Sequence, residues 1–209
     1  MATPTHQPFP ATAPVSINAP VFQQDRYMAR TKVFSWTPKY YFQDANGNTF
    51  AFLRKKLLTW KDEIRLFTDE SQSMELLFIK ARKIIDWGTA FDVTDSLNHQ
   101  KVGAVKRKGW KSLFRSEWII MDANDQEIGK IKESSAFAAT IHRFIKFIPQ
   151  QFTFYLGDRQ IGTVKQNWNL FAPKMDVDFS EDPGRSLDRR LGAAAVILLL
   201  AVETREQQN

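Results

Sequence analysis

The chain has 209 residues, of which 43% are hydrophobic and 13% aromatic, so it can bury a core and is not a wholly disordered protein. Its formal net charge of +6 favours phosphate-rich partners such as membrane headgroups or nucleic acid. The lack of cysteine excludes disulfides, thiolate metal sites, cysteine nucleophiles and palmitoylation. The first 24 residues contain no Lys or Arg and so lack the pattern of a signal peptide, and we expect a cytoplasmic chain.

Residues 1–25 are predicted to form a proline-rich flexible tail. Proline favours extended backbone, and the segment has too few apolar residues to fold alone. An alternative role for it is docking to a protein partner. The segment has no glycine, and it holds five of the nine prolines, namely Pro4, Pro8, Pro10, Pro14 and Pro20.

From about Arg26 onward, short runs rich in β-branched and aromatic residues are broken every eight to twelve positions by Asp, Asn or Gly, which is typical of antiparallel sheet. Tyr40–Gln43 and Thr49–Arg54 flank an Asn-Gly pair, which supplies the positive φ angles of a tight hairpin. The pattern predicts nine further strands: Ile64–Thr68, Glu75–Lys80, Phe91–Thr94, Val102–Lys106, Glu117–Met121, Glu127–Lys132, Phe152–Leu156, Gln160–Lys165 and Lys174–Phe179.

A hairpin unit repeats along this series. Its second strand reads apolar-Gly-x-apolar-Lys at Val102–Lys106, Ile128–Lys132 and Ile161–Lys165. Glycine weakens the interior of a strand, so its recurrence there indicates either a β-bulge or a close approach by another part of the protein.

The segment Leu191–Val202 is apolar on every face, with Ser186 as a candidate N-cap. Such a helix is either buried in protein or placed in lipid. Twelve residues span about 18 Å, which is short of the roughly 30 Å hydrocarbon core, and two arginines precede the segment. We therefore predict a mainly β protein in which residues 26–209 form a closed barrel around a hydrophobic C-terminal helix over about 187–204.

The hairpin repeats, the stretch Ser116–Asp122, the Ile-Gly-x-Ile of Ile128–Ile131 and the sequence Asp188-Arg-Arg-Leu before an Ala- and Leu-rich end resemble the tubby-like C-terminal superfamily. The resemblance covers roughly Phe34–Glu203. Branches of that superfamily include phospholipid scramblases and LURP-one-related proteins. The resemblance implies a twelve-stranded antiparallel barrel around a central hydrophobic helix, and a membrane-associated, non-enzymatic role. Unlike eukaryotic scramblases, the chain lacks a cysteine-rich palmitoylation stretch and has a shorter final helix, which argues against lipid translocation.

A basic stretch is the main candidate for a binding site. Together with Lys101, its cations fall within fifteen residues that contain no acid. Such a loop can place cations on anionic headgroups while a tryptophan enters the membrane interface. The alternatives are a solvated hairpin whose tryptophan packs on the barrel, or a site for single-stranded nucleic acid, for which no RRM, KH or helix-turn-helix pattern is present. The candidate headgroup-binding residues are Lys106, Arg107, Lys108, Trp110, Lys111 and Arg115.

Calcium is the one metal considered, at Asp176 and Asp178, because the resemblance to scramblases implies an acidic segment before the helix. A loop of the EF-hand type needs Gly at its sixth position and Glu at its twelfth, and these places hold Glu181 and Leu187. The stretch Asp122–Glu133 also lacks the glycine. The alternative is that these carboxylates belong to turns and strand ends.

Motifs of enzymes are absent. Gly157–Thr163 has the two glycines of a Walker A loop but Thr where lysine is required, and the three histidines are far apart in sequence. The leading hypothesis is thus a scramblase-related, non-enzymatic protein that binds or moves phospholipids, placed peripherally at the inner face of a membrane. The alternative is a soluble LURP-one-related barrel that binds a ligand or a protein and has no membrane role.

Overall fold

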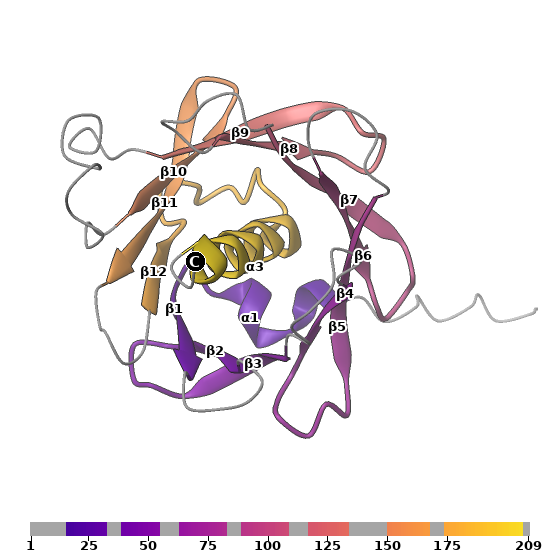
Figure 1. The fold of residues 1–209 in the computed structure, drawn as a ribbon, viewed down its shortest axis with the longest axis vertical. Coiled ribbons are helices and arrows are strands. Elements are labelled where there is room, and N and C mark those ends of the chain that lie inside the picture. Colours follow the sequence, from indigo (N-terminus) through magenta and orange to yellow (C-terminus); the bar gives the residue numbers. More distant parts are fainter. Residues whose placement is uncertain are drawn as a thin grey trace, which may run out of the picture.

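The computed structural model describes residues 16–32, 39–54, 63–82, 89–108, 117–133, 150–167 and 174–206. They form a closed barrel of twelve antiparallel strands, with a helix, α3 (Arg189–Glu206), inside it (Figure 1). The predicted fold class is therefore confirmed.

Each strand pairs with the next one along the chain, and β1 pairs with β12 to close the barrel. The sequence predicts eleven of these strands and misses β1. The strands are β1 (Arg26–Lys32), β2 (Lys39–Gln43), β3 (Thr49–Arg54), β4 (Glu63–Phe67), β5 (Glu75–Ala81), β6 (Ala90–Asp95), β7 (Lys101–Arg107), β8 (Glu117–Met121), β9 (Glu127–Glu133), β10 (Gln151–Leu156), β11 (Arg159–Asn167) and β12 (Lys174–Asp178).

The up-and-down order gives the barrel two different ends. Five short hairpin turns, at residues 44–48, 68–74, 96–100, 122–126 and 157–158, lie at one end, which we call the turn end. The opposite strand termini form the far end. Helix α3 starts at the turn end, where Arg190 bonds to Asp95 at the close of β6, and runs towards the far end.

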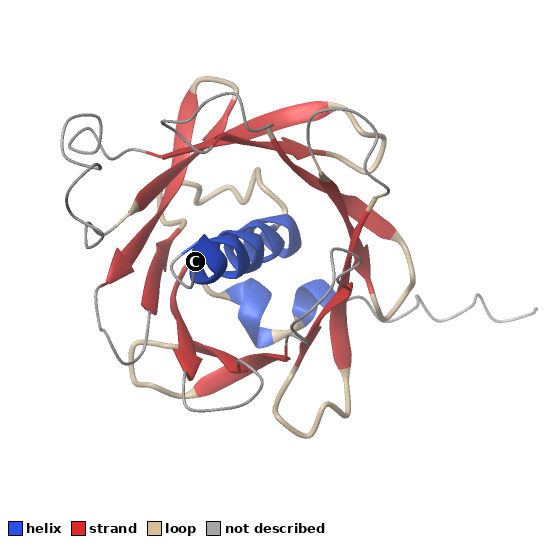
Figure 2. Cartoon of the chain, viewed as in Figure 1, coloured by secondary structure: helices blue, strands red, loops and turns tan. Residues whose placement is uncertain are grey.

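Every face of α3 is enclosed, which explains why the helix has no polar face. The side chains from Ala193 to Leu200 are at most 3% exposed. Figure 2 shows the helices surrounded by the ring of strands. The carboxylate of Asp188 accepts the N–H of Arg190 at 2.9 Å and so caps the helix; the prediction of Ser186 as the N-cap is wrong. No helix in the described part of the chain is long and apolar enough to cross a membrane.

The N-terminal segment also lies inside the barrel. A 3-10 turn, η1 (Ser16–Asn18), and a short helix, α1 (Pro20–Gln23), lie beside α3 (Figure 1). Val21 and Phe22 are 1% and 0% exposed and belong to the core. The predicted flexible tail therefore extends too far along the chain, because two apolar residues at its end bury themselves against α3 and β3. Residues 1–15 lie outside the described residues.

The repeated glycines mark both features that the sequence allowed. The strand register shifts by one residue beside Gly103, Gly129 and Gly162, which confirms the bulges. A Cβ on Gly103 would lie 2.9 Å from the Leu191 side chain of α3, and one on Gly162 would lie 2.7 Å from the carbonyl oxygen of Asp178. The bulged strands thus bring their backbone close to neighbouring elements.

Candidate functional site

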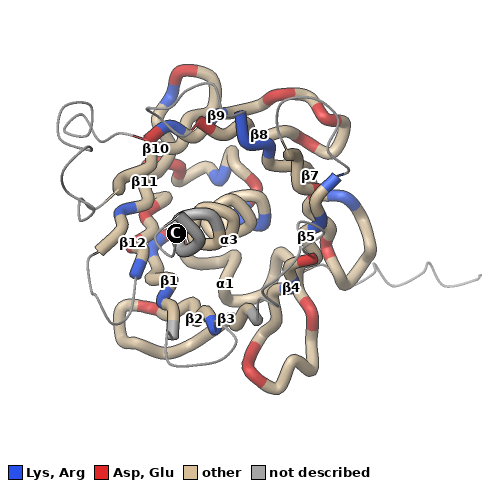
Figure 3. The backbone as a smooth tube through the Cα atoms, in the orientation of Figure 1, with Lys and Arg blue, Asp and Glu red and all other residues tan. Residues whose placement is uncertain are grey.

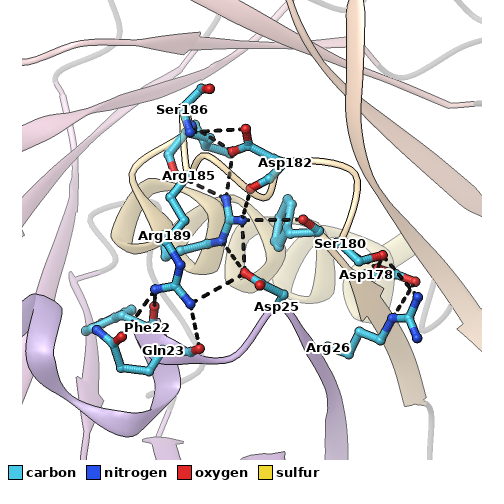
Figure 4. Close-up of polar contacts among 12 residues, drawn as sticks. Phe22, Gln23, Asp25, Arg26, Asp178, Ser180, Asp182, Arg185, Ser186 and Arg189 are labelled. Atoms are coloured by element: carbon cyan, nitrogen blue, oxygen red, sulfur yellow. Dashed lines mark hydrogen bonds and ion pairs between the residues drawn. The ribbon is translucent and has the colours of Figure 1, made fainter.

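The turn end contains a buried network of charges centred on Arg189 (Figure 4). The guanidinium of Arg189 is 3% exposed and donates to Asp182 at 2.9 Å and to Asp25 at 2.9 Å. It also donates to the carbonyl oxygens of Phe179 and Asp182. This one side chain therefore ties the start of α3 to β1 and to the loop after β12.

Asp182 is fully buried and accepts hydrogen bonds from the backbone N–H groups of Ser186 and Leu187 and from Arg159. Burial by itself raises the pKa of Asp182, but these bonds and that from Arg189 outweigh it and lower the pKa to about 2. The carboxylate is therefore ionised and saturated with donors at neutral pH.

Two further arginines fasten the N-terminal segment to the barrel. Arg185 donates to the carbonyl oxygens of Phe22 and Gln23, at 3.0 and 2.6 Å (Figure 4). Arg190 bonds at 2.8 Å to the buried Asp95, which also accepts the N–H and the hydroxyl of Ser16. These polar groups satisfy one another, so we assign them a structural role rather than a catalytic one.

The carboxylates of the turns are also used within the fold. Asp44 and Asp122 each accept two backbone N–H groups of their own hairpin turn, and Asp69 accepts one. Hydrogen bonds from Asn48 lower the pKa of Asp44. The acidic character of the turn end therefore follows from turn formation.

The two calcium candidates lie on the outer face of β12. Asp178 accepts the N–H and hydroxyl of Ser180 at 2.8 and 2.6 Å and pairs with Arg26 at 3.0 Å, whereas Asp176 is exposed. Burial raises the pKa of Asp178, but the bonds from Ser180 and Arg26 lower it overall. Among the residues that the structure describes, no group of three or more His, Cys, Asp or Glu is placed to hold a metal ion.

The interior of the described barrel is filled. The seam between α3 and β2–β4 is apolar and too narrow to hold a water molecule. Its lining residues are Tyr40, Phe42, Leu53, Ile64, Ile197, Leu200 and Ala201. Any ligand of the barrel as described must therefore bind on its outside.

The predicted basic stretch begins at the far end of β7. Lys106 lies on the outer face of the strand, Lys108 pairs with Glu117 at 3.1 Å, and Arg107 lies 5.8 Å from the ring centroid of the buried Trp118. Lys101 lies at the turn end of the same strand, where it pairs with Asp125. Three of the predicted site residues, Trp110, Lys111 and Arg115, lie outside the described residues.

The sequence reasoning missed four further cations of the same kind. With Lys106 they form what we call the cation belt: Arg30, Lys106, Lys132, Lys165 and Lys174. All five lie on the outer faces of strands, within two residues of the far end. Within the described part of the chain, none of them forms an ion pair or a side-chain hydrogen bond. Figure 3 shows cationic positions on β7, β11, β12 and β1 around the wall.

The repeat carries a signal for three belt members. Lys106, Lys132 and Lys165 each follow the bulge glycine by three positions, which turns them to the outer face of β7, β9 and β11. The sequence alone does not show that they lack carboxylate partners, because that depends on which residues the neighbouring strands place beside them.

A family model described as LURP-one-related matches residues 75–193, which is more than half of the chain. The chain belongs to the LURP-one-related family. This family is part of the tubby-like superfamily and is generally non-enzymatic, so the resemblance seen in the sequence is confirmed at that level. The scramblase branch is not supported by the match. No curated protein matched the chain.

Proposed function

We propose that this LURP-one-related protein is a non-enzymatic, peripheral binder of anionic phospholipid membranes, and that it contacts headgroups through the far end of its barrel. The observation that carries the proposal is the division of charge between the two ends. Carboxylates at the turn end serve turns and buried ion pairs, whereas the belt cations at the far end have no partner within the fold. Cations that the fold does not use are available to phosphate groups.

The sequence between the strands supports this choice of partner. The segments that join strand termini at the far end have more Lys and Arg than Asp and Glu. They also hold five of the six tryptophans, namely Trp36, Trp60, Trp87, Trp110 and Trp168. Tryptophan and cationic side chains together are typical of residues at a membrane surface.

We propose binding rather than translocation of lipid. Movement of a polar headgroup across a bilayer requires a polar path, and the interior of the described barrel is filled by α3 and the N-terminal segment. The proposed headgroup contacts are Lys106, Arg107 and Lys108, with Trp110, Lys111 and Arg115, which follow them in sequence.

Sedimentation with vesicles tests the function. We expect the protein to sediment with phosphatidylserine-containing vesicles, to stay in solution with phosphatidylcholine alone, and to dissociate as salt rises. The variant Lys106→Gln/Lys108→Gln/Lys111→Gln should bind on the order of 100-fold more weakly, since each cation contributes about 1 kcal/mol. A matched control, Arg26→Gln/Arg65→Gln/Lys101→Gln, removes three charges elsewhere. Equal binding to both kinds of vesicle would refute the proposal and favour the soluble ligand- or protein-binding alternative.

A further inference from the structure

The cation belt covers opposite walls of the barrel. In the closed order of twelve strands, β1 and β7 are six positions apart, so Arg30 and Lys106 lie on opposite sides. Between them, on the β9–β12 side, come Lys132, Lys165 and Lys174. Outward side chains on opposite walls point in opposite directions.

Two members of the belt are direct neighbours despite their like charge. Arg30 and Lys174 are partners in the β1–β12 pairing, and the latter lies one strand away from Lys165 on β11. Asp176, opposite Lys165, forms no ion pair with it among the described residues. Like charges placed directly opposite each other on a sheet are destabilising, so this arrangement lowers stability unless an anion from outside neutralises it.

The remaining far-end cations on the other half of the barrel are engaged in ion pairs where the structure describes them. Lys39 pairs with Glu70 at 2.9 Å, and Lys80 pairs with Glu63 at 3.2 Å. Arg82 bonds to both Asp92 and Asp125. The free cations thus follow one continuous arc, from β7 through β9, β11 and β12 to β1.

We propose that the membrane-bound barrel stands on its far end, with Lys106 on one wall and Arg30, Lys165 and Lys174 on the other in contact with headgroups, and with the turn end directed away. A flat surface can meet outward cations on opposite walls only if it lies across the barrel end. The belt residues are within about 7 Å of that end, at 3.3 Å per residue. The inference rests on the proposed function and adds the orientation and a second group of headgroup contacts.

Matched substitutions on the same strand test the contacts. We expect Arg30→Gln and Lys106→Gln each to weaken binding to phosphatidylserine vesicles about fivefold, since each loses about 1 kcal/mol. Arg26→Gln and Lys101→Gln remove the same charge from the turn ends of the same two strands and should leave binding unchanged. If only one of the two walls matters, or if the turn-end variants weaken binding equally, the end-on orientation is wrong.

Fluorescent labels test the orientation directly, because the chain has no cysteine of its own. Single cysteines with an environment-sensitive dye are placed at the far end on two walls, Thr89→Cys and Asn167→Cys, and at the turn end of the same walls, Gln100→Cys and Asp158→Cys. End-on binding predicts a blue shift at both far-end sites and none at the turn-end sites. A shift at Asn167 and Asp158 alone would show that the barrel lies on its β10–β11 side and would overturn the inference. Absence of sedimentation would instead refute the proposed function itself.

Discussion

Asp182 makes the stability of the protein depend on pH. Its pKa of about 2 in the folded protein is below the ordinary 3.8, so the unfolded chain takes up a proton first as pH falls. The stabilisation is complete above about pH 4, is lost between about pH 4 and 2, and amounts to about 2 kcal/mol.

We expect Asp182→Asn to lower the free energy of unfolding by about 3 kcal/mol at pH 7, because it leaves Arg189 buried with less compensating charge. The deficit should shrink towards pH 3. Urea unfolding of both proteins at several pH values measures it, with Asp158→Asn, whose carboxylate is exposed, as the control. A deficit that stays constant with pH would contradict the assignment.

A second prediction at this scale concerns calcium at Asp176 and Asp178. Because Asp178 already serves Ser180 and Arg26, we expect micromolar calcium to leave the melting temperature unchanged. Calorimetry with calcium and with chelator measures this. A rise of several degrees that disappears in Asp176→Asn/Asp178→Asn would restore the calcium hypothesis.

The bulge glycines show what single residues reveal before a structure is known. Glycine inside a strand has few causes, so the repeat at Gly103, Gly129 and Gly162 identifies bulges by itself. A lysine on a strand has many roles. Lys106 and Lys108 differ only in that one of them meets Glu117, and this is decided by the pairing of β7 with β8.

Among the elements, α3 is the one that most of the core packs around. Leu198→Asp would bury an unpaired carboxylate and should cost several kcal/mol, close to the whole stability of a typical domain. The fragment of residues 1–184 loses the helix altogether. We expect no cooperative thermal transition from this fragment by circular dichroism. A cooperative melt would mean that the strands fold without α3.

The N-terminal segment contributes to the same core. Phe22 is fully buried, so Phe22→Ala should lower the free energy of unfolding by about 3 to 5 kcal/mol. Phe9→Ala, in the part still predicted to be a flexible tail, is the matched control and should have little effect. Urea unfolding measures both, and equal effects would contradict the assigned place of Phe22.

The sequence predicts eleven strands and the buried helix because each has a strong local pattern. β1 escapes because its inward positions are Tyr27, Ala29 and Thr31, which form a weak apolar face between charged residues. The burial of Val21 and Phe22 escapes because a proline-rich composition predicts a tail. Only contacts distant in sequence, such as those of Arg185, hold this segment inside the barrel.

For the molecule as a whole, closure of the barrel brings together residues far apart in the chain. Arg26 pairs with Asp178, across nearly the full length of the barrel. Proteins dominated by such distant pairings fold slowly, in milliseconds to seconds or longer, because chain entropy is lost before the contacts form. We expect refolding from urea on the order of seconds, followed by stopped-flow tryptophan fluorescence. Completion within about a millisecond would contradict this expectation.

The place of α3 in the chain has a consequence during synthesis. The helix follows all twelve strands, so the ribosome releases residues 26–178 over on the order of ten seconds before the helix emerges. Throughout that interval the inward faces of the strands have nothing to enclose, and their edges can pair with other nascent chains. The protein should therefore depend on chaperones while it is translated, and its final fold can form only after the last strand has left the ribosome.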